Sequence, residues 1–303
     1  MQASDSLETH IGSLGAVDHR AVNWAQVRWT ACLIHQHLRY DYPGHIHDLR
    51  QRLMLVPPDT HGDQRLVTYK LEVSAPVADT KREIDAYGNS VSKLSIDYVE
   101  QAIDFTAWIV VERDARHGPL RLPHAPGVAF VQPSALTQPD DALRFAAATL
   151  RTQEADDLTL ATLINQYVYK HFTYGHGATG VRTTAAEAFH LARGVCQDYA
   201  HVMLALCRCC GIPARYVSGH LLGEGGTHAW VEALLRDPQA GGTWTAYPFD
   251  PTHGRMPWLN YLTVAVGRDY GDVAPTSGSF RAPYAGHLST KKRAGVTAIE
   301  YAA

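Results

Sequence analysis

The chain has 303 residues, a formal net charge of −3 and 46% hydrophobic residues. This length suits one large domain or two modest ones, and the apolar content is sufficient for a core, which argues against disorder across the whole chain. The near-neutral charge argues against a protein that binds nucleic acid mainly through its phosphates. No stretch approaches the roughly 20 apolar residues of a membrane span. Neither a nucleic acid nor a membrane is therefore an expected partner.

The N-terminal residues and the cysteine count indicate a compartment. MQASDSLETHIGSLGAVDHR lacks the basic patch and the apolar run of a secretory signal peptide. The chain has five cysteines, and this odd number does not describe a disulfide framework. We therefore expect free thiols and a cytoplasmic protein.

The first part of the chain predicts strands. Residues 1–22 are polar and weakly patterned, which indicates a flexible arm. From Val27 onward, β-branched and aromatic residues alternate in part along segments such as VRWTACLIHQHLRYDY, RLVTYKLEVS and AIDFTAWIVVER. Turn-like segments such as PPDTHGD and DAYGN separate them. The pattern predicts an all-β, sandwich-like domain over 23–115, followed by a proline-rich connector over 116–140.

Beyond the connector the apolar period becomes helical. ALRFAAATLRT and DDLTLATLINQYVYKHF both place apolar residues three and four positions apart. TTAAEAFHLAR predicts a third helix, which begins at Thr183 or Thr184 and has Glu187 as the acid of a capping box.

Strand patterns follow the helices. ARYVSGHLL, THAWVEALL and WTAYPFD each read as a strand, with a glycine-rich turn at Gly223–Gly226. Helices followed by an antiparallel sheet predict an α+β domain over 141–290. Residues 291–303 contain a short basic cluster and are expected to form a solvated C-terminal tail.

One cysteine lies at the start of a predicted helix. RGVCQDYAHVMLALCRCCGIPARY predicts a helix from about Val195 to Cys210, and Gly194 is expected to end the preceding helix in the left-handed conformation. Positions four, seven, eight and eleven after Cys196 form one apolar helical face, made by Ala200, Met203, Leu204 and Cys207. Cys196 would then lie in the first helical turn, where free N–H groups and the helix dipole stabilise a thiolate and can hold an oxyanion.

A lone buried cysteine is more often a small core residue, so partners must decide whether this thiol is a nucleophile. A nucleophilic thiol needs a base, and the base needs an orienting group. His228 opens an apolar strand directly after a glycine-rich loop, and Asp250 ends another strand just before Pro251, which disfavours helix at Asp250. Antiparallel pairing of these two strands would bring the imidazole and the carboxylate together.

These segments resemble a known family. GVCQDYAHVMLALCRCCGIPARYVSGHL, THAWVE and FDPTHG are similar in type and order to motifs of the transglutaminase-like superfamily, and more closely to its bacterial members of cysteine protease type. The N-terminal text YDYP, LRQRLMLVP and DAYGN resembles the domain that accompanies this catalytic domain in bacteria. YLTVAVGRDYGDVAPTSGSF is also similar to the segment that follows the aspartate motif. The resemblance covers nearly the whole chain and implies a papain-like α+β domain of transglutaminase type after the β-sandwich-like domain.

The resemblance also implies a chemistry. Its nucleophile, base and orienting acid correspond to Cys196, His228 and Asp250, which predicts acyl transfer through a thioester on a peptide or protein substrate, with no cofactor and no metal. The family's usual description favours hydrolysis by a cysteine peptidase or amidase; a transglutaminase, with an amine as acceptor, is the alternative. A non-catalytic binding or assembly module is an alternative of another class.

One departure from the motif of this family is His253, where many members have Asn. The sequence indicates no oligomeric state.

Other residues have competing interpretations. Cys207 and Cys210 have a zinc-like spacing but share one helix with Cys209, so core packing is the expected role of the three. A solvated strand face is preferred to a metal site for the two H-x-H pairs, His35, His37, His45 and His47. A metal-dependent hydrolase would use His220 and His253 with His228 and Asp250, but this leaves Cys196 without a role.

Three expectations concern the surroundings of the site. Trp230 is expected to pack in the core, with shielding of the site as the alternative. Asp198 is expected to favour the helix N-terminus and to point away from the thiol, because a nearby carboxylate opposes thiolate formation. Arg268 and Asp269 are expected to form an ion pair.

Overall fold

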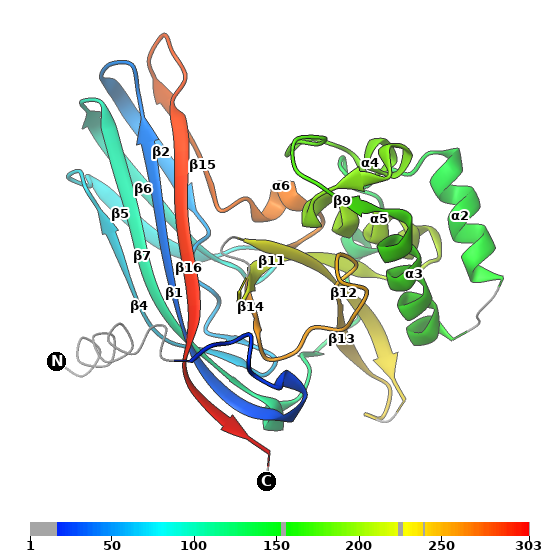
Figure 1. Ribbon diagram of the computed structural model, residues 1–303. Coiled ribbons are helices and arrows are strands. Elements are labelled where there is room, and N and C mark those ends of the chain that lie inside the picture. Colours follow the sequence, from blue (N-terminus) through cyan, green and yellow to red (C-terminus); the bar gives the residue numbers. More distant parts are fainter. Residues whose placement is uncertain (1–16, 153–155, 224–226, 239, 303) are drawn as a thin grey trace.

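Two sheets form the N-terminal domain, and strands from the C-terminal part of the chain complete both of them (Figure 1). The computed structural model describes residues 17–152, 156–223, 227–238 and 240–302. One sheet has the order β16-β1-β7-β4-β3, and the other has the order β15-β2-β6-β5. The strands are β1 (Val27–Asp41), β2 (Ile46–Leu53), β3 (Thr60–His61), β4 (Gln64–Val73), β5 (Asp79–Ile84), β6 (Ser90–Val99), β7 (Ala102–Asp114), β15 (Thr276–Arg281) and β16 (His287–Tyr301).

Alternating residues of these strands fill the space between the sheets. Successive side chains of a strand point to opposite faces, so every second residue of β7 enters the core. These residues are Ile103, Phe105, Ala107, Ile109 and Val111, and each is fully buried. They share one apolar cluster with residues of the second sheet, such as Leu49 and Ile96. The predicted all-β domain is therefore a two-layer sandwich with a single core.

The C-terminal residues differ from the expected tail. Residues 291–303 belong almost entirely to β16, which pairs antiparallel with β1 from His287 opposite Asp41 to Tyr301 opposite Val27. β15 likewise pairs with β2. Because β16 is an edge strand, Lys291 and Arg293 can face water while the backbone is paired, whereas Lys292 is partly buried. The sandwich therefore resumes at Thr276, inside the range expected for the second domain.

The predicted arm and connector have different outcomes. Residues 1–16 of the arm lie outside the described residues. The connector contains the short helices η2 (Ala115–His117) and η3 (Val128–Phe130), and the strand β8 (Arg121–Leu122) lies between them. β8 pairs with β13, so the connector adds an edge strand to the sheet of the second domain. A further short helix, η1 (Trp24–Gln26), precedes β1.

The second domain packs helices against an antiparallel sheet of order β14-β11-β12-β13-β8, as the α+β prediction required. Its strands are β11 (Ala214–Leu221), β12 (His228–Asp237), β13 (Thr243–Phe249) and β14 (Tyr261–Gly267), with a short parallel pair β9 (Thr173–Tyr174) and β10 (Arg193–Gly194). Its helices are α2 (Asp141–Arg151), α3 (Asp157–His171), α4 (Ala185–Leu191), α5 (Cys196–Cys209) and α6 (Tyr270–Val273).

Helix α5 is the centre of this domain. It contacts β11 and β12 on the sheet and α2, α3 and α4 on its other sides (Figure 1). A helix that is covered on all sides is buried around its whole circumference, and every residue from Gln197 to Arg208 is buried. The first residue of α5, Cys196, is partly exposed, and the last, Cys209, is exposed. No helix in the described part of the chain is long and apolar enough to cross a membrane.

Candidate active site

Cys196 is the first residue of α5, and its thiol is partly exposed. The strand β10 immediately precedes this turn, and the Asp198 carboxyl group caps it. Asp198 Oδ2 accepts a hydrogen bond from the Val195 N–H at 2.7 Å and another from the Thr179 hydroxyl at 2.7 Å. The carboxyl group is thus directed at the helix start and at Thr179, in agreement with the expected capping role. Burial raises the pKa of this carboxyl group.

Gly194 is required for a reason other than the one expected. The left-handed residue that ends α4 is Ala192, with φ 48°. A Cβ atom at Gly194 would lie 2.4 Å from Asp198 Oδ2 and 2.7 Å from Asp198 Cβ. Glycine at this position therefore leaves room for the carboxyl group that caps α5. The predicted start of α4 is confirmed, because Thr184 and Glu187 form the capping box.

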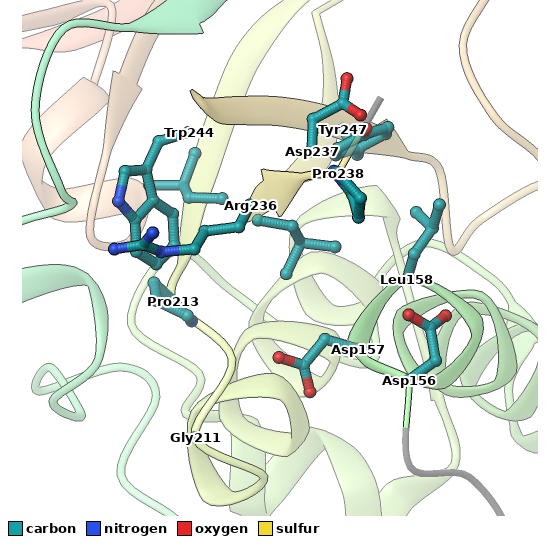
Figure 2. Close-up of a pocket in the computed structure, with 12 residues that line it drawn as sticks. Asp156, Asp157, Leu158, Gly211, Pro213, Arg236, Asp237, Pro238, Trp244 and Tyr247 are labelled. Atoms are coloured by element: carbon teal, nitrogen blue, oxygen red, sulfur yellow. The ribbon is translucent and has the colours of Figure 1, made fainter. Parts of the chain in front are cut away.

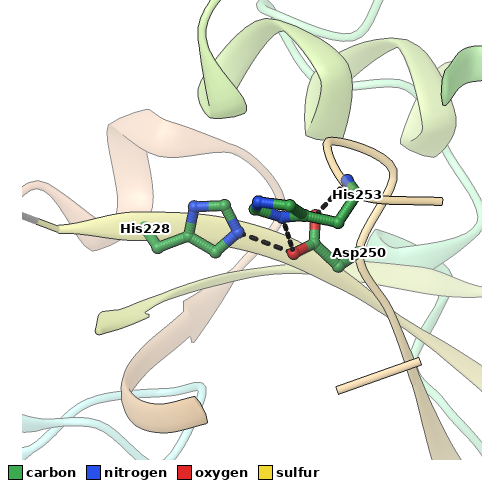
Figure 3. A group of neighbouring side chains, drawn as sticks. All are labelled: His228, Asp250 and His253. Atoms are coloured by element: carbon green, nitrogen blue, oxygen red, sulfur yellow. Dashed lines mark hydrogen bonds and ion pairs between the residues drawn. The ribbon is translucent and has the colours of Figure 1, made fainter. Parts of the chain in front are cut away.

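His228 and Asp250 come together where two paired strands end. β12 begins at His228 and pairs antiparallel with β13, which ends one residue before Asp250. His228 Nε2 lies 2.8 Å from Asp250 Oδ2, and Figure 3 shows the imidazole and the carboxylate facing each other. The side chains are 2% and 0% exposed. This antiparallel pairing is the one that the strand patterns predicted.

The His228 ring also forms a hydrogen bond with the Cys196 thiol. Because Nε2 is bound to Asp250, Nδ1 is the nitrogen that remains for the sulfur. Burial alone would lower the pKa of the imidazole, but the hydrogen bonds with Asp250 and Cys196 outweigh it and raise this pKa to about 10. Burial would raise the pKa of Asp250, yet its contacts with His228 and His253 hold it well below its ordinary value. At neutral pH the site therefore contains an imidazolium between a carboxylate and a sulfur.

Asp250 has more donors than the sequence indicated. His253 Nδ1 at 2.7 Å and the Tyr261 hydroxyl at 2.7 Å both share Oδ2 with His228. The backbone N–H groups of Thr252 and His253 donate to Oδ1. From sequence, His253 was noted as a departure from the family pattern and as a residue of the metal-dependent alternative, and its hydrogen bond with Asp250 was not predicted. Tyr261 lies on another strand and opens the segment YLTVAVGRDYGDVAPTSGSF, but the resemblance of that segment assigned it no role at the carboxylate.

Trp230 packs beside the catalytic candidates. It is 2% exposed and belongs to a small apolar cluster with Val217 and Tyr261. Its ring centroid lies 6.2 Å from that of His228. A Cβ atom at Gly219 would come within 2.5 Å of the indole, so the facing strand β11 leaves space for this ring. The expected core packing is confirmed, and it places an apolar wall beside the imidazole.

One group of side chains could form a metal site. Among the described residues, His228, Asp250 and His253 have ligand atoms within 4.8 Å of one another and could hold a metal ion. His220, the fourth residue of the alternative, is not part of this group. In the group the nitrogen atoms already contact Asp250 Oδ2 through hydrogen bonds (Figure 3). A metal ion there would have to displace the protons that join the imidazole rings to the carboxylate.

The other histidine and cysteine candidates lie apart from the site. His37 bonds to Asp104 at 2.8 Å, and His35 stacks on Trp108 at 3.9 Å. Cys207 is buried in the core as expected, whereas Cys209 is exposed. His201 is buried on α5 and its Nε2 accepts a hydrogen bond from the Tyr270 N–H; burial lowers the pKa of His201 to about 4. His35 and His37 lie on β1 of the sandwich, and Cys207, Cys209 and His201 lie on α5 beyond its first turn.

The expected ion pair of Arg268 has a different partner. Arg268 donates to both carboxylate oxygens of Asp272, at 2.8 and 2.9 Å. Asp269 instead caps α6 by accepting from the Gly271 N–H. Adjacent side chains in an extended segment diverge, whereas the short helix α6 turns Asp272 back toward Arg268.

A cavity of about 780 Å³ lies away from these residues. It opens between the start of α3 and the far end of the β12–β13 hairpin (Figure 2). Arg236 stacks over the Trp244 ring at its edge, at 5.4 Å. Cys196, His228 and Asp250 are not among the described residues that line this cavity. The candidate active site is defined by its side chains, at the N-terminal end of α5.

Comparison with known proteins agrees with this arrangement. Residues 144–251 match the family model of the transglutaminase-like superfamily, and residues 32–112 match that of the bacterial transglutaminase-like N-terminal region. The first match contains Cys196, His228 and Asp250. The two matches stand in the order that the sequence motifs implied.

Two mycobacterial proteins are similar to this chain. An uncharacterized protein of Mycobacterium leprae is 44% identical over 117 residues, which are 35% of this chain and only 39% of that protein. An uncharacterized protein of Mycobacterium tuberculosis is 29% identical over 252 residues, which are 71% of this chain and 76% of that protein. A crystal structure from Cytophaga hutchinsonii, named "Putative Cysteine Protease", has a TM-score of 0.73 at 22% identity and covers 91% of this chain and 94% of its own. At that identity the likeness shows a common fold for both domains.

Proposed function

The chain belongs to the transglutaminase-like superfamily, and on this premise we propose that it is a thiol-dependent acyl-transfer enzyme acting on peptide or amide substrates. Cys196 is the nucleophile, His228 the general acid and base, and Asp250 the orienting acid. One observation carries the proposal: a single imidazole contacts both the sulfur at the start of α5 and a buried carboxylate.

In the first step, the Cys196 thiolate attacks the carbonyl carbon of the amide. The carbonyl oxygen becomes an oxyanion, and the backbone N–H groups of Cys196 and Gln197 at the start of α5 can stabilise it, whereas those of Asp198 and Tyr199 donate to the Val195 carbonyl. The tetrahedral intermediate collapses, the C–N bond breaks, and the His228 imidazolium gives its proton to the departing amine. A thioester on Cys196 remains.

The electrostatics of His228 fit both halves of this reaction. With a pKa of about 10, the free ring is protonated at neutral pH and is the partner that a thiolate needs. Part of this elevation comes from Cys196. Once the sulfur is part of a thioester it carries no negative charge, so the pKa of the ring falls and the neutral imidazole can activate the acceptor. Asp250 keeps the ring oriented throughout.

We propose water as the acceptor, which makes the chain a cysteine peptidase or amidase. The name of the Cytophaga hutchinsonii protein favours hydrolysis over transfer to an amine. The test is incubation with a glutamine-containing peptide and a labelled primary amine, with Cys196→Ala as the control. Hydrolysis releases ammonia or a shorter peptide and leaves the label free. A stable labelled amide that requires Cys196 would contradict hydrolysis and identify a transglutaminase.

Whether the chain is a catalyst at all is tested by competitive alkylation. Iodoacetamide labelling, read by mass spectrometry across pH, is expected to modify Cys196 faster than the other thiols, because the Cys196 sulfur is paired with the His228 imidazolium. Cys209 is the appropriate comparison because it is exposed, whereas Cys207 is buried and inaccessible. If Cys196 and Cys209 acquire label in parallel across pH, the chain is a binding module instead of an enzyme.

A further inference from the structure

The N-terminal domain covers an open edge of the catalytic sheet. β14 is the first strand in that sheet and has a neighbour, β11, on one side. On the other side, the Gln64 amide donates to the Thr263 carbonyl at 2.7 Å and accepts from the Thr263 N–H at 2.8 Å. Asn89 makes the same pair of bonds with Val266, at 2.8 and 2.7 Å. Two buried side-chain amides thus replace part of a neighbouring strand.

Arg113 extends this contact to the beginning of β14. It lies on β7 of the sandwich, and its Nη1 donates to the carbonyl groups of Trp258, at 3.2 Å, and Tyr261. Three hydrogen bonds to Asp63, of 2.5 to 2.9 Å, hold the guanidinium in place. A bidentate arginine pair of this kind has a fixed geometry. The sandwich therefore fixes the backbone at the residue where β14 starts.

That residue is also a donor to the candidate catalytic acid. The Tyr261 hydroxyl donates to Asp250 Oδ2 at 2.7 Å and accepts from Arg255 Nε at 3.1 Å. The ring is fully buried and stands edge-on to Trp230, with centroids 5.5 Å apart. Burial and the neighbouring carboxylate raise the pKa of Tyr261, so its hydroxyl keeps its proton and remains a donor. A continuous set of contacts therefore joins the sandwich to Asp250.

We propose that the N-terminal domain positions the catalytic carboxylate, because Arg113 fixes the backbone of Tyr261 and the Tyr261 hydroxyl holds Asp250 toward His228. This inference rests on the proposed function, since it assigns a role to residues around the same triad. Tyr261 and Arg113 are positioning residues and do not contact the reacting atoms. The N-terminal domain is then a part of the active-site architecture as well as a cover for the apolar surface of the catalytic domain.

The expected effect has a definite sign. Removing the Tyr261 hydroxyl takes one of three donors from Asp250 Oδ2, and the carboxylate then attracts the His228 imidazolium more strongly. The pKa of His228 should therefore rise above its present value of about 10. The titratable and charged groups that face this carboxylate and its donors are Cys196 from α5, His228 from β12, His253 and Arg255 from the loop after β13, and Tyr261 from β14.

The test measures the rate of Cys196 alkylation against pH in the full chain. In the wild type, the reactivity should change near the pKa of His228, where the imidazolium is lost. We expect Tyr261→Phe to move this alkaline transition upward by about half to one pH unit, the equivalent of one hydrogen bond. Arg113→Ala should move it in the same direction. The double variant should move it no further than Tyr261→Phe alone, because Arg113 acts through the hydroxyl that is already absent.

Asn89→Ala is the matched control, since Asn89 holds the same strand five residues away from Tyr261. It should lower the unfolding temperature and leave the alkaline transition in place. If Tyr261→Phe and Arg113→Ala also lower stability without moving the transition, the contacts are structural and the inference is wrong while the proposed function stands. Additive shifts in the double variant would equally overturn it. A wild-type Cys196 with the profile of an ordinary thiol would instead remove the proposed function itself.

Discussion

Asp250 Oδ2 accepts hydrogen bonds from an imidazolium, a second imidazole and a phenol. The carboxylate is fully buried, and an isolated buried charge would cost several kcal/mol. The donors offset that cost and also fix the direction in which the carboxylate acts on His228. The charge of Asp250 is therefore maintained by its surroundings, and those surroundings can be altered one donor at a time.

Asp250→Asn removes this charge and keeps the size of the side chain. We expect acyl transfer to fall by about 10²- to 10⁴-fold, because His228 loses the partner that orients it and favours its protonation. The alkaline transition of Cys196 alkylation should move to lower pH. Asp141→Asn is the control, since the side chain of Asp141 is fully exposed. Unchanged activity in Asp250→Asn would contradict the assigned role of the carboxylate.

The same substitution has a consequence for stability that depends on pH. The pKa of Asp250 is lower in the folded chain, so its contribution is present above the ordinary value of about 4 and is lost as the pH falls below it. The pKa of His228 is higher in the folded chain, so its contribution is present below about 6.5 and is lost as the pH rises through about 10. Urea unfolding should therefore show the largest loss of stability in Asp250→Asn between about pH 4 and 6.5, with a smaller loss near pH 10 and above.

His253→Asn distinguishes a second donor from a metal ligand. The amide N–H of an Asn at this position can replace Nδ1 as a donor to Asp250. We expect activity within about fivefold of the wild type, because one net hydrogen bond contributes about 1 kcal/mol. Elemental analysis should show no stoichiometric metal in either protein, and a chelator should leave activity intact. A metal ion present in the wild type and lost in His253→Asn would support the metal-dependent alternative.

At the scale of the element, the start of α5 requires that residue 194 has no side chain, because the Asp198 carboxyl group occupies that space. Gly194→Ala would place a methyl group against the Asp198 carboxyl group, which must then leave its bonds with Val195 and Thr179. We expect a loss of about 1–3 kcal/mol in the free energy of unfolding and slower alkylation of Cys196, both measured on purified protein. Gly127→Ala is the control, because nothing lies within 4 Å of a Cβ atom there. Equal stability of the two variants would contradict the role of Gly194.

Helix α5 itself could be predicted from the sequence. Apolar residues at helical spacing predicted a helix from Val195 to Cys210, and the structure has one from Cys196 to Cys209. The reason for glycine at position 194 could not be predicted from the sequence, since a glycine can indicate either a left-handed backbone or a lack of space for a side chain. Only the position of the Asp198 side chain distinguishes these, and that position is set by Thr179, well before it in the sequence.

The candidate site was predictable to the same extent. Strand patterns predicted that His228 and Asp250 would meet, because adjacent antiparallel strands bring their ends together. Tyr261 was missed because its contact with Asp250 depends on the loop between β13 and β14, whose path no local pattern describes. Arg113 was missed because it reaches the site from another domain. Local periodicity predicts which residues share a face and does not predict which distant elements meet.

At the scale of the molecule, the sandwich contains residues from both parts of the chain. β16 pairs with β1 along nearly its entire length, and Val296 lies in the sandwich core. The basic cluster within β16 had indicated a tail because charge is typical of solvated segments. An edge strand satisfies the same pattern, since one of its faces and one of its sides are in water.

Deleting residues 287–303 tests this arrangement. The deletion would expose the edge of β1 and part of the sandwich core, so we expect a large drop in unfolding temperature or recovery only in the insoluble fraction. Lys291→Ala within β16 is the control, because Lys291 is exposed, and it should change stability by less than about 0.5 kcal/mol. A truncated chain that unfolds at the wild-type temperature would show that the pairing of β16 with β1 contributes little.

The pairing of β16 with β1 also sets an order of events during biosynthesis. β1 is translated before the second domain, and β16, which covers the edge of β1, is translated only after that domain. At about 5–20 residues per second, this interval is on the order of 10 to 50 seconds. During this interval the edge of β1 in the nascent chain is unpaired, so molecular chaperones or neighbouring nascent chains can bind there.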